Sequence, residues 1–468
     1  MKIIILGAGQ VGSGLVEYLV NENNEITLVD NNYEKLQAIK NRFDIKVVQG
    51  YGSYPATLRS ADADNADLLV AVTNSDEINM LACQLGYSLF HIPQKIARIL
   101  NRDYIAEKEL LFADQAIPVD NIIAPENLIM LEIVKLIEFP GVTQMAEFAD
   151  GRLCMASVKA YYGGTNVGYP ISSLKKTLNN VIAKIIAIYR QDKMIIINDN
   201  TVIEAGDEVY FIAAKSHVKQ VISTLQKQEL PYRRIMIIGG GNIARDLAMN
   251  ICNKYSVKLI ETNQNRATEL ANEFDPTSVQ VFCSDPSDQN FLIEEHIDMM
   301  DLVIAVTDND ETNIMTALLA KKMGAKKAIV LIKKYAYINL LSNNAIDVYL
   351  SPKDATISAL LTNIRRNGIN NVKTLKHGLA EGMEIKLTGD SASSGVIGKK
   401  IKEIQFPTGI IIGAIARGND IFIPGPEDVL QGNDLIIFFV SEKRSIKDLI
   451  KLTSPKATYF AGNSKERN

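Results

Sequence analysis

Two glycine-rich segments are the parts of this sequence whose residue types and spacing could bind a ligand. The first reads "GAGQVG" (Gly7–Gly12) after a β-branched run, and the second reads "GGGNIA" (Gly239–Ala244) in the same setting. The first glycine of such a segment permits a tight turn, the second lets the backbone approach a pyrophosphate, and the third lets a helix pack closely on a strand. The helix that follows presents free N–H groups to an anion. The candidate phosphate-binding residues are Gly7, Gly9, Gln10, Val11, Gly12, Gly239, Gly241, Asn242 and Ile243.

An acidic residue ends the apolar run that follows each glycine segment. Asp30 holds this place in the first copy and Glu261 holds it in the second. A carboxylate there accepts hydrogen bonds from ribose hydroxyls and repels a 2′-phosphate, so the pattern favours NAD or adenosine-ribose ligands over NADP. The alternative is that one copy, most readily the second, is a structural duplicate that has lost its ligand.

A second pair of matching segments, "AVTNSDEIN" (Ala71–Asn79) and "AVTDNDETN" (Ala305–Asn313), ends in a predicted helix. Thr73 with Asp76, and Thr307 with Asp310, have the spacing of a capping box, so one interpretation is a well-capped helix. The other interpretation is ligand contact, because these loops follow strands at the edge where open α/β sheets bind ligands. The candidate contacts to adenine or ribose are Thr73, Asn74, Asn79 and Thr307.

Basic residues follow the fifth predicted strand of each copy. They are Arg98 and Arg102 in the first copy, and Lys333 and Lys334 in the second. Near the ligand edge these side chains could neutralise a nucleotide phosphate. The alternative, solvated surface charge, suits Arg102 and Lys334 better than Arg98, which lies in an apolar run.

The two glycine segments belong to a long internal repeat. The glycine segments, the "AVT" loops, Pro125 with Pro352, and Gly168 with Gly398 all recur in the same order, about 230 residues apart. Each copy begins with short apolar runs that alternate with helical stretches, which predicts a doubly wound parallel sheet. The strands expected in the first copy are Lys2–Leu6, Glu25–Val29, Lys46–Val48, Asp67–Val72, Lys95–Leu100 and Gln115–Pro118.

A helix opening near Pro125 is expected to follow the first sheet. Its residues from Leu128 to Ile137 are almost all apolar, so it should be covered on both sides, either by a second copy of the protein or inside its own subunit. A small α+β module then completes each copy. The expected divisions are a Rossmann-like part at 1–140, a small module at 141–228, a second Rossmann-like part at 232–368, a second small module at 369–453, and a loose tail at 454–468.

Composition restricts the function further. The 468 residues carry a net charge of −4, and this balance argues against a nucleic-acid partner. The four cysteines and four histidines show no metal-ligand spacing, and the cysteine usage is typical of a reducing cytoplasm. No apolar run is long enough to span a bilayer, and the N-terminal residues are read as a first strand rather than as a signal peptide.

With these features in place, the sequence resembles the TrkA family, the cytoplasmic nucleotide-binding subunits of bacterial Trk potassium uptake. The resemblance is carried by "GAGQVG" with Asp30, by "AVTNSDEIN", by Arg98 in "ARILNRDY", and by their counterparts in the second copy. It implies two tandem RCK units and a homotetrameric ring on the inner face of the cell membrane. It also implies a membrane-embedded Trk channel partner that is gated by NAD(H), ATP or ADP. Two departures, Leu331 in place of Arg98 and Ser284-Asp285 in place of Gly50-Tyr51, indicate that the two units bind nucleotide differently.

A regulatory switch and an NAD-dependent oxidoreductase are the two main functional hypotheses. A dehydrogenase needs an acid or base beside the nicotinamide, and the small modules repeat no such constellation; His217 and His377 do not fall at equivalent positions. A transcription factor is least favoured, since no basic recognition helix is evident. The sequence therefore predicts a binding protein with no catalytic residues, whose ligand selects between two states.

Overall fold

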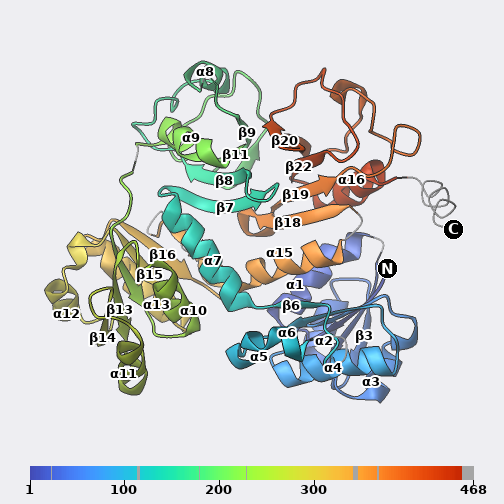
Figure 1. The fold of residues 1–468 in the computed structure, drawn as a ribbon, viewed down its shortest axis with the longest axis horizontal. Coiled ribbons are helices and arrows are strands. Elements are labelled where there is room, and N and C mark those ends of the chain that lie inside the picture. The colour runs from blue at the N-terminus through green and yellow to red at the C-terminus, as the bar shows by residue number, and fades with distance from the viewer. Residues whose placement is uncertain are drawn as a thin grey trace. The chain divides into compact units, whose positions relative to one another are not determined.

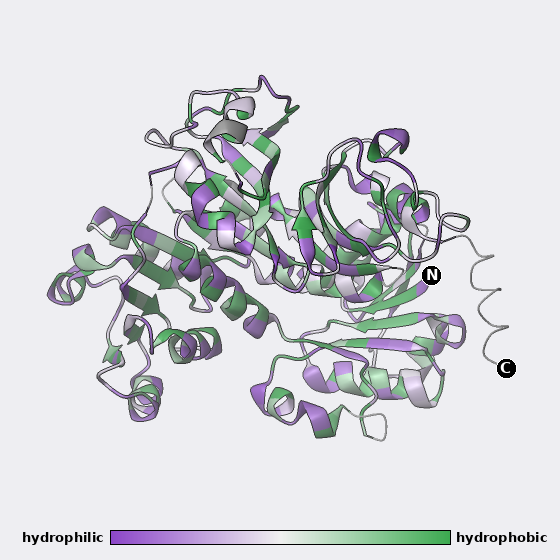
Figure 2. Cartoon of the chain, turned by 45° about the horizontal axis from the view of Figure 1, so that its top comes forward, coloured by the Kyte–Doolittle hydropathy of each residue, from purple (hydrophilic) through white to green (hydrophobic). Residues whose placement is uncertain are grey.

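The computed structural model describes residues 1–22, 24–112, 116–178, 180–227, 229–340, 346–365 and 368–455 (Figure 1). The expected tail at 454–468 lies outside the described residues except for Ser454 and Pro455. The described residues form two six-stranded and two five-stranded sheets, with helices packed on them. Hydrophobic residues are concentrated on the strands of these sheets, where the cores lie (Figure 2).

The first large sheet is parallel and has the strand order β3-β2-β1-β4-β5-β6. Because the order reverses direction after β1, right-handed crossovers place helices on both faces of the sheet. Its strands are β1 (Lys2–Leu6), β2 (Glu25–Asp30), β3 (Lys46–Gln49), β4 (Leu68–Ala71), β5 (Gln94–Arg98) and β6 (Asn121–Ile123). Its helices are α1 (Gln10–Leu19), α2 (Tyr33–Lys40), α3 (Pro55–Ser60), α4 (Asp76–Ser88), α5 (Arg102–Ala106) and α6 (Lys108–Leu111).

The second large sheet repeats this topology, in the order β14-β13-β12-β15-β16-β17. The predicted pair of doubly wound sheets is therefore confirmed. Its strands are β12 (Arg234–Ile238), β13 (Ser256–Glu261), β14 (Val279–Cys283), β15 (Leu302–Ala305), β16 (Lys327–Leu331) and β17 (Val348–Leu350). Its helices are α10 (Asn242–Ile251), α11 (Gln264–Glu273), α12 (Gln289–Glu294), α13 (Asp310–Lys322) and α14 (Tyr335–Leu340).

The sixth strand of the first sheet was placed wrongly from the sequence. The prediction was Gln115–Pro118, but Ala116–Pro118 is not a strand and Gln115 lies outside the described residues. The strand is Asn121–Ile123, which pairs in parallel with β5. Its three residues are too short a run for hydrophobic periodicity to locate.

Each small module is an antiparallel five-stranded sheet, in the orders β10-β9-β11-β8-β7 and β18-β19-β22-β20-β21. A turn at Gln191-Asp192 joins the third and fourth strands of the first module, and both residues have positive φ. The first module contains β7 (Val142–Phe148), β8 (Leu153–Lys159), α8 (Ile171–Thr177), β9 (Ala183–Arg190), β10 (Lys193–Ile195), β11 (Glu208–Ala214) and α9 (Val218–Leu225). The second contains β18 (Ile369–Leu375), β19 (Ala380–Lys386), β20 (Ile410–Arg417), β21 (Asp420–Phe422), β22 (Leu435–Val440) and α16 (Ile446–Thr453).

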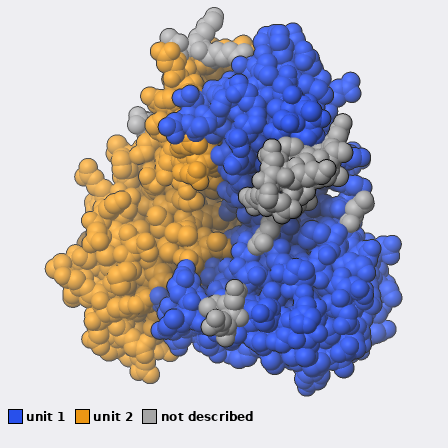
Figure 3. All heavy atoms as spheres, turned by 45° about the vertical axis from the view of Figure 1, so that its right-hand side comes forward, with its two compact units in different colours: residues 1–125, 353–468 blue, residues 126–352 orange. Residues whose placement is uncertain are grey.

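Two proline-initiated helices, α7 (Pro125–Glu138) and α15 (Pro352–Ile364), connect the large sheets to the small modules. The chain forms two compact units, and the sequence repeats do not coincide with them. Residues 1–125 pack with residues 353–468, and residues 126–352 form the other unit (Figure 3). Each helix thus leaves the sheet that precedes it in sequence and joins the other repeat's Rossmann-like part.

Helix α7 was expected to be covered on both sides. Ile129 and Ile133 are fully buried within the chain itself, but Leu131 remains 44% exposed. The chain therefore covers one face of the helix and leaves the face of Leu131 accessible. The alternative cover, a second copy of the protein, stays a prediction.

A buried ionic triad joins the parts of the first unit. Arg365, just after α15, donates to Glu22 near the end of α1 and to Glu381 on β19, each with a shortest N···O distance of 2.5 Å. All three side chains are at most 8% exposed. Burial alone lowers the pKa of the Arg365 guanidinium, but the two carboxylates outweigh burial and raise that pKa. The triad fixes the Rossmann-like part, the helix and the second small module to one another.

Cysteine reactivity gives a direct test of this packing. Burial raises the pKa of Cys83 and of Cys154 to about 12 each, whereas Cys283 is exposed and Cys252 is partly exposed. Because the thiolate is the reactive form, a thiol reagent at pH 8 should label Cys283 and Cys252 in the native protein and leave the buried pair intact. Mass spectrometry of tryptic peptides identifies the labelled residues. Rapid native labelling of Cys83 or Cys154 would contradict the packing around them.

Candidate functional site

The predicted ligand-binding residues gather at the carboxyl edges of the two parallel sheets. We call the first edge site the group formed by Gly7–Gly12, Asp30, Thr73–Asn79 and Arg98. The second edge site is Gly239–Ala244, Glu261, Thr307–Asn313 and Leu331. Each group comes from segments that follow, or end, different strands of one sheet, because the carboxyl ends of parallel strands share an edge.

The first glycine of each loop lies directly over the neighbouring strand end. Gly7 has φ 105°, and a Cβ there would approach the carbonyl oxygen of Val72 to 3.0 Å. Gly239 has φ 107°, and a Cβ there would lie 3.0 Å from Cγ2 of Thr307. Both the positive φ and the close approach favour glycine.

The second and third positions of the loop differ in their surroundings. A Cβ on Gly9 would have no heavy atom within 4 Å, and the same holds for Gly241. By contrast, a Cβ on Gly12 would lie 1.9 Å from the carbonyl oxygen of Gly7. Gly9 and Gly241 therefore leave open space at a helix start, where a ligand's phosphate could approach the backbone, and Gly12 allows close packing within the loop.

The remaining loop residues lie at the starts of helices α1 and α10. Gln10 and Asn242 are the first residues of these helices. The side chain of Gln10 is exposed, while Val11 and Ile243 are buried under the helices. Polar contact with a ligand can thus come from Gln10 and Asn242, and the two apolar side chains hold the helices on the sheets.

The acid at the end of the second strand supports the glycine loop. Asp30 accepts hydrogen bonds from the backbone of Ala8 at 2.6 Å and of Asn32 at 2.8 Å. Glu261 accepts in the same way from Gly240 at 2.6 Å and from Asn263 at 2.7 Å. Both carboxylates are partly exposed, and a carboxylate oxygen has more than one lone pair. Each can therefore also accept from a ribose hydroxyl.

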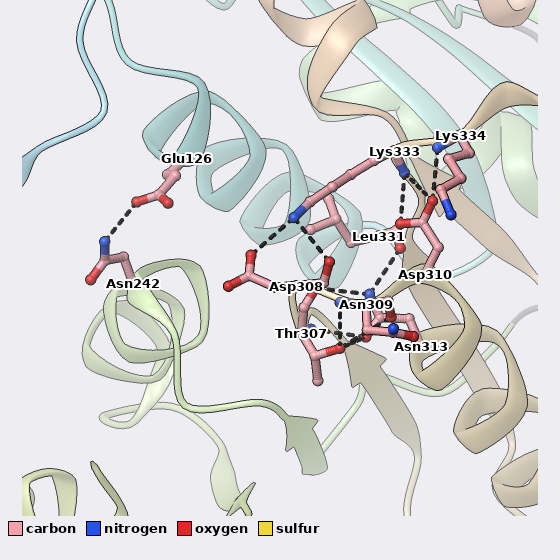
Figure 4. A network of polar contacts seen from close by, with 10 residues as sticks. All are labelled: Glu126, Asn242, Thr307, Asp308, Asn309, Asp310, Asn313, Leu331, Lys333 and Lys334. Carbon is pink, nitrogen blue, oxygen red and sulfur yellow. Dashed lines mark hydrogen bonds and ion pairs between the residues drawn. The ribbon is translucent and has the colours of Figure 1, made fainter. Parts of the chain in front are cut away.

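The "AVT" loops are organised by a buried asparagine. Asn79 is fully buried; its Oδ1 accepts from the backbone N–H and the hydroxyl of Thr73, and its Nδ2 donates to the carbonyl oxygens of Thr73 and Arg98. Asn313 makes the same bonds to Thr307 and Leu331 (Figure 4). The expectation that Asn79 itself reaches a ligand does not fit this burial; it positions Thr73, while Asn74 is exposed on the same loop.

The predicted capping boxes are wrong in one respect. The residue that caps α4 is Ser75, whose hydroxyl accepts from the backbone of Ile78, and Asn309 caps α13 through Thr312. Thr73 and Thr307 stand two residues earlier. Asp76 instead accepts from the backbone N–H groups of Leu100 and Asn101, just after β5, at 2.7 to 3.0 Å. Asp310 accepts from the backbone N–H groups of Lys333 and Lys334, just after β16, at 2.8 to 3.1 Å. The acids thus connect two loops of each site, which spacing alone could not reveal.

Arg98 is the cation of the first edge site. Its Nη2 donates to the carbonyl oxygen of Thr73 at 2.7 Å, and its Nε is buried without a hydrogen-bond partner among the described residues. Burial lowers the pKa of Arg98, and the nearby Asp76 carboxylate partly opposes this. An incompletely satisfied guanidinium bonded to the loop of Thr73 is suited to binding an anion at this edge. Arg102 lies farther along, at the start of α5.

The second edge site has different charges. Leu331 stands where Arg98 stands in the first site. Lys333 donates to Asp308 at 2.9 Å (Figure 4), and Lys334 donates to Glu311 of α13 at 3.2 Å. The two lysines expected to neutralise a phosphate are therefore each paired with an acid.

Sequence reasoning missed two further groups at the second site. Asn242 donates to Glu126 of α7 at 3.0 Å (Figure 4), and Arg266 Nε donates to the carbonyl oxygen of Gly240 at 2.9 Å. Glu126 follows Pro125 as Lys353 follows Pro352, and Lys353 lies against α1, near Gly14. The repeat could have suggested that Glu126 and Lys353 are equivalent. Only the structure shows that each lies against the helix that follows the glycine loop of the other repeat, α10 for Glu126 and α1 for Lys353.

Within the described ranges, no group of three or more histidine, cysteine or acidic residues is arranged to hold a metal ion. In those same ranges no helix combines the length and the apolar character that crossing a bilayer requires.

Comparison with known proteins gives a consistent result. The family model of the TrkA-N domain matches residues 3–119 and 235–352, and that of the TrkA-C domain matches residues 156–226 and 390–452. The chain is 49% identical over 460 residues to the Trk system potassium uptake protein TrkA of Haemophilus influenzae, covering 98% of this chain and 100% of that protein. The namesake protein of Vibrio alginolyticus matches at the same identity and coverage.

Solved structures match the fold. The crystal structure of the GsuK RCK domain aligns with a TM-score of 0.58 at 19% identity, covering 96% of this chain and 94% of that one. The GsuK channel bound to NAD aligns with a TM-score of 0.57 at 19% identity, covering 97% of this chain and 78% of that one. At this identity the likeness concerns the fold alone.

Proposed function

This chain belongs to the TrkA family of Trk system potassium uptake proteins, and we propose that it controls potassium entry by binding an adenine nucleotide at its first edge site. It is a regulatory component of potassium transport in a family that is not enzymatic. The observation that carries the proposal is the first edge site itself. There an open glycine loop, a carboxylate and an incompletely satisfied arginine meet at one sheet edge.

The chemistry of the first site suits the ADP part that NAD(H), ATP and ADP share. The open position over Gly9 can receive a diphosphate at the start of α1. Arg98 supplies positive charge, and Asp30 can accept from the adenosine ribose. A GsuK channel structure is described as bound to NAD, which is consistent with such a ligand in this fold.

The second site is expected to bind nucleotides differently. It has Leu331 in place of Arg98, and its two lysines are paired with acids. Glu126 adds a carboxylate beside Asn242, at the helix start where a phosphate would lie. We infer that a nucleotide with free phosphates binds more tightly at the first site than at the second.

Binding can be coupled to a conformational change through the packing of the first unit. The Rossmann-like part that carries the first site packs with α15 and the second small module, tied by the buried triad. A ligand that binds one arrangement of these parts more tightly shifts the population toward it. We propose that a homotetramer of this chain, in the cytoplasm against the inner face of the membrane, passes this shift to a membrane-embedded Trk channel subunit.

The competing oxidoreductase hypothesis has no support in the small modules. Nδ1 of His217 accepts from the backbone of Ile182 at 3.0 Å, which gives that histidine a structural role. His377 has a different neighbour: its Nδ1 lies 3.7 Å from Oδ2 of Asp354. These two histidines are therefore not equivalent and do not form an acid–base group that the two modules repeat.

One experiment tests both hypotheses. The gene is deleted and replaced by wild type or by Arg98→Gln, and potassium uptake is measured alongside nucleotide affinity of the purified protein. We expect deletion to remove most uptake, and the variant to weaken ADP binding about tenfold through loss of a charge-assisted contact. The absorbance of bound NADH should stay constant in the presence of small carbonyl compounds. Turnover of NADH, or uptake unaffected by deletion, would overturn the proposal.

A further inference from the structure

We propose that Tyr51 and Tyr54 form a stacking platform that recognises the purine base of the nucleotide held at the first edge site. This inference rests on the proposed nucleotide-binding function and names a base contact for that site. The two rings lie with centroids 5.3 Å apart at an interplanar angle of 47°. Tyr51 is 47% exposed and Tyr54 is 57% exposed. Large flat side chains with accessible faces are suited to stacking on a base.

The loop that carries the tyrosines is fixed to the first edge site. Gly50 donates to the carbonyl oxygen of Asp30 at 2.9 Å, so the loop begins beside the acid that supports the glycine loop. Gly52 is buried, and a Cβ there would lie 2.8 Å from Leu6 Cδ1. Leu6 immediately precedes Gly7. The tyrosines are therefore held next to the strand ends from which the phosphate-binding and ribose-binding groups come.

Backbone contacts hold the loop that carries the two tyrosines. Tyr54 donates its backbone N–H to the carbonyl oxygen of Tyr51 at 3.0 Å, which closes the loop. Pro55 then starts α3 at the first helical position, where proline restricts the backbone. Preorganised aromatic groups lose little conformational freedom when a ligand stacks on them.

The second edge site provides an internal comparison. Gln49 pairs with Asp30, and Cys283 pairs with Glu261, so the two loops start in the same register. Counting from there, Asp285 and Asp288 occupy the positions of Tyr51 and Tyr54.

These two aspartates hold the loop by accepting hydrogen bonds, and neither has an aromatic ring on which a base could stack. Asp285 accepts from the backbone and hydroxyl of Ser287, and Asp288 caps α12 by accepting from Asn290. Carboxylates in place of the tyrosines also oppose an anionic ligand. The first site is thus specific for a ligand with an aromatic base, and the second site lacks that selection.

The test compares ligands with and without a base on the full-length protein. Affinities for ADP and for inorganic pyrophosphate are measured by competition against a fluorescent ADP analogue. The variants are Tyr51→Ala/Tyr54→Ala and Tyr51→Phe/Tyr54→Phe, with Tyr162→Ala as the matched control because Tyr162 is 89% exposed in a small module. The alanine pair should weaken ADP binding about 10-fold to 100-fold and leave pyrophosphate binding unchanged. The phenylalanine pair and the control should bind both ligands like wild type.

A second readout separates stacking from an indirect effect. In saturation-transfer NMR, the adenine H2 and H8 signals of ADP should weaken relative to the ribose H1′ signal in the alanine pair. Unchanged ADP affinity in that variant, or an equal loss of ADP and pyrophosphate, would overturn the platform while leaving the proposed function intact. If wild-type protein binds no adenine nucleotide at all, the proposed function itself fails.

Discussion

Replacing Gly9 with glutamate is expected to abolish nucleotide binding at the first edge site while leaving the protein folded. The backbone at Gly9 is extended, with φ −73° and ψ −169°, so any residue can adopt it, and a Cβ there meets no neighbour within 4 Å. The new carboxylate would stand where the ligand's phosphates approach the start of α1. Juxtaposed like charges cost several kcal/mol, so affinity for ADP or NADH should fall about 100-fold or more. Isothermal titration measures this loss, and thermal unfolding checks the fold.

Two other glycines are the controls for this experiment. Gly241 has the same open surroundings in the second loop, so Gly241→Glu should fold and should leave the first site's affinity unchanged. Gly12→Ala should instead destabilise the fold, because its Cβ would lie 1.9 Å from the backbone oxygen of Gly7. That clash must move the loop, so the midpoint of unfolding should fall. If Gly9→Glu binds nucleotide with wild-type affinity, the glycine loop is not the phosphate site.

Replacing Arg365 with methionine should destabilise the first unit strongly. The substitution would leave Glu22 and Glu381 buried without their shared cation, and Glu381 is fully buried. Removing one member of a buried ion pair typically costs about 3–5 kcal/mol of unfolding free energy. Urea unfolding followed by circular dichroism measures the change. The transition of residues 1–125 with 353–468 should move to lower urea, and the transition of residues 126–352 should not.

Comparison with other replacements tests the cause. Arg444→Ala removes an arginine that is 83% exposed and paired with Glu442, so stability should change by less than about 1 kcal/mol. Replacing all three triad members with apolar residues should restore much of the loss, because no charge is then left buried. A loss below about 1 kcal/mol for Arg365→Met would show that the triad is not what fixes these parts together.

The elements were predictable where local pattern and tertiary packing favour the same structure. Strand β1 and helix α1 are such a case: the run after Lys2 is apolar and mostly β-branched, and the glycines that follow allow the tight turn into a helix. The start of α7 at Pro125 was equally clear, because proline suits the first turn of a helix. Strand β6 was not predictable from the sequence, because a run of three residues carries too little periodic signal. Its hydrogen-bonded pairing with β5 defines it as a strand.

The candidate residues lie at the carboxyl edges of the two parallel sheets, and their contact with a ligand stays a prediction. The hydrogen bonds of single residues differ from those expected from the sequence. Thr73 and Asp76 have capping-box spacing, yet Ser75 caps the helix. Asp76 accepts from the backbone of the loop after β5, and Asn79 fixes Thr73. The role of Asp76 depends on a contact with Asn101, 25 residues away in the sequence, so propensity and spacing cannot assign it.

The sequence by itself determined the repeat, the two parallel sheets and the positions of the glycine loops. These follow from side-chain periodicity and from the backbone freedom of glycine, which are local properties. Only the tertiary structure decided which repeat's parts pack together, because α7 and α15 each belong to the compact unit that holds the other repeat's Rossmann-like part. That exchange places Glu126 beside Asn242 and Lys353 beside α1. The charge of each site therefore depends on residues far away in the chain.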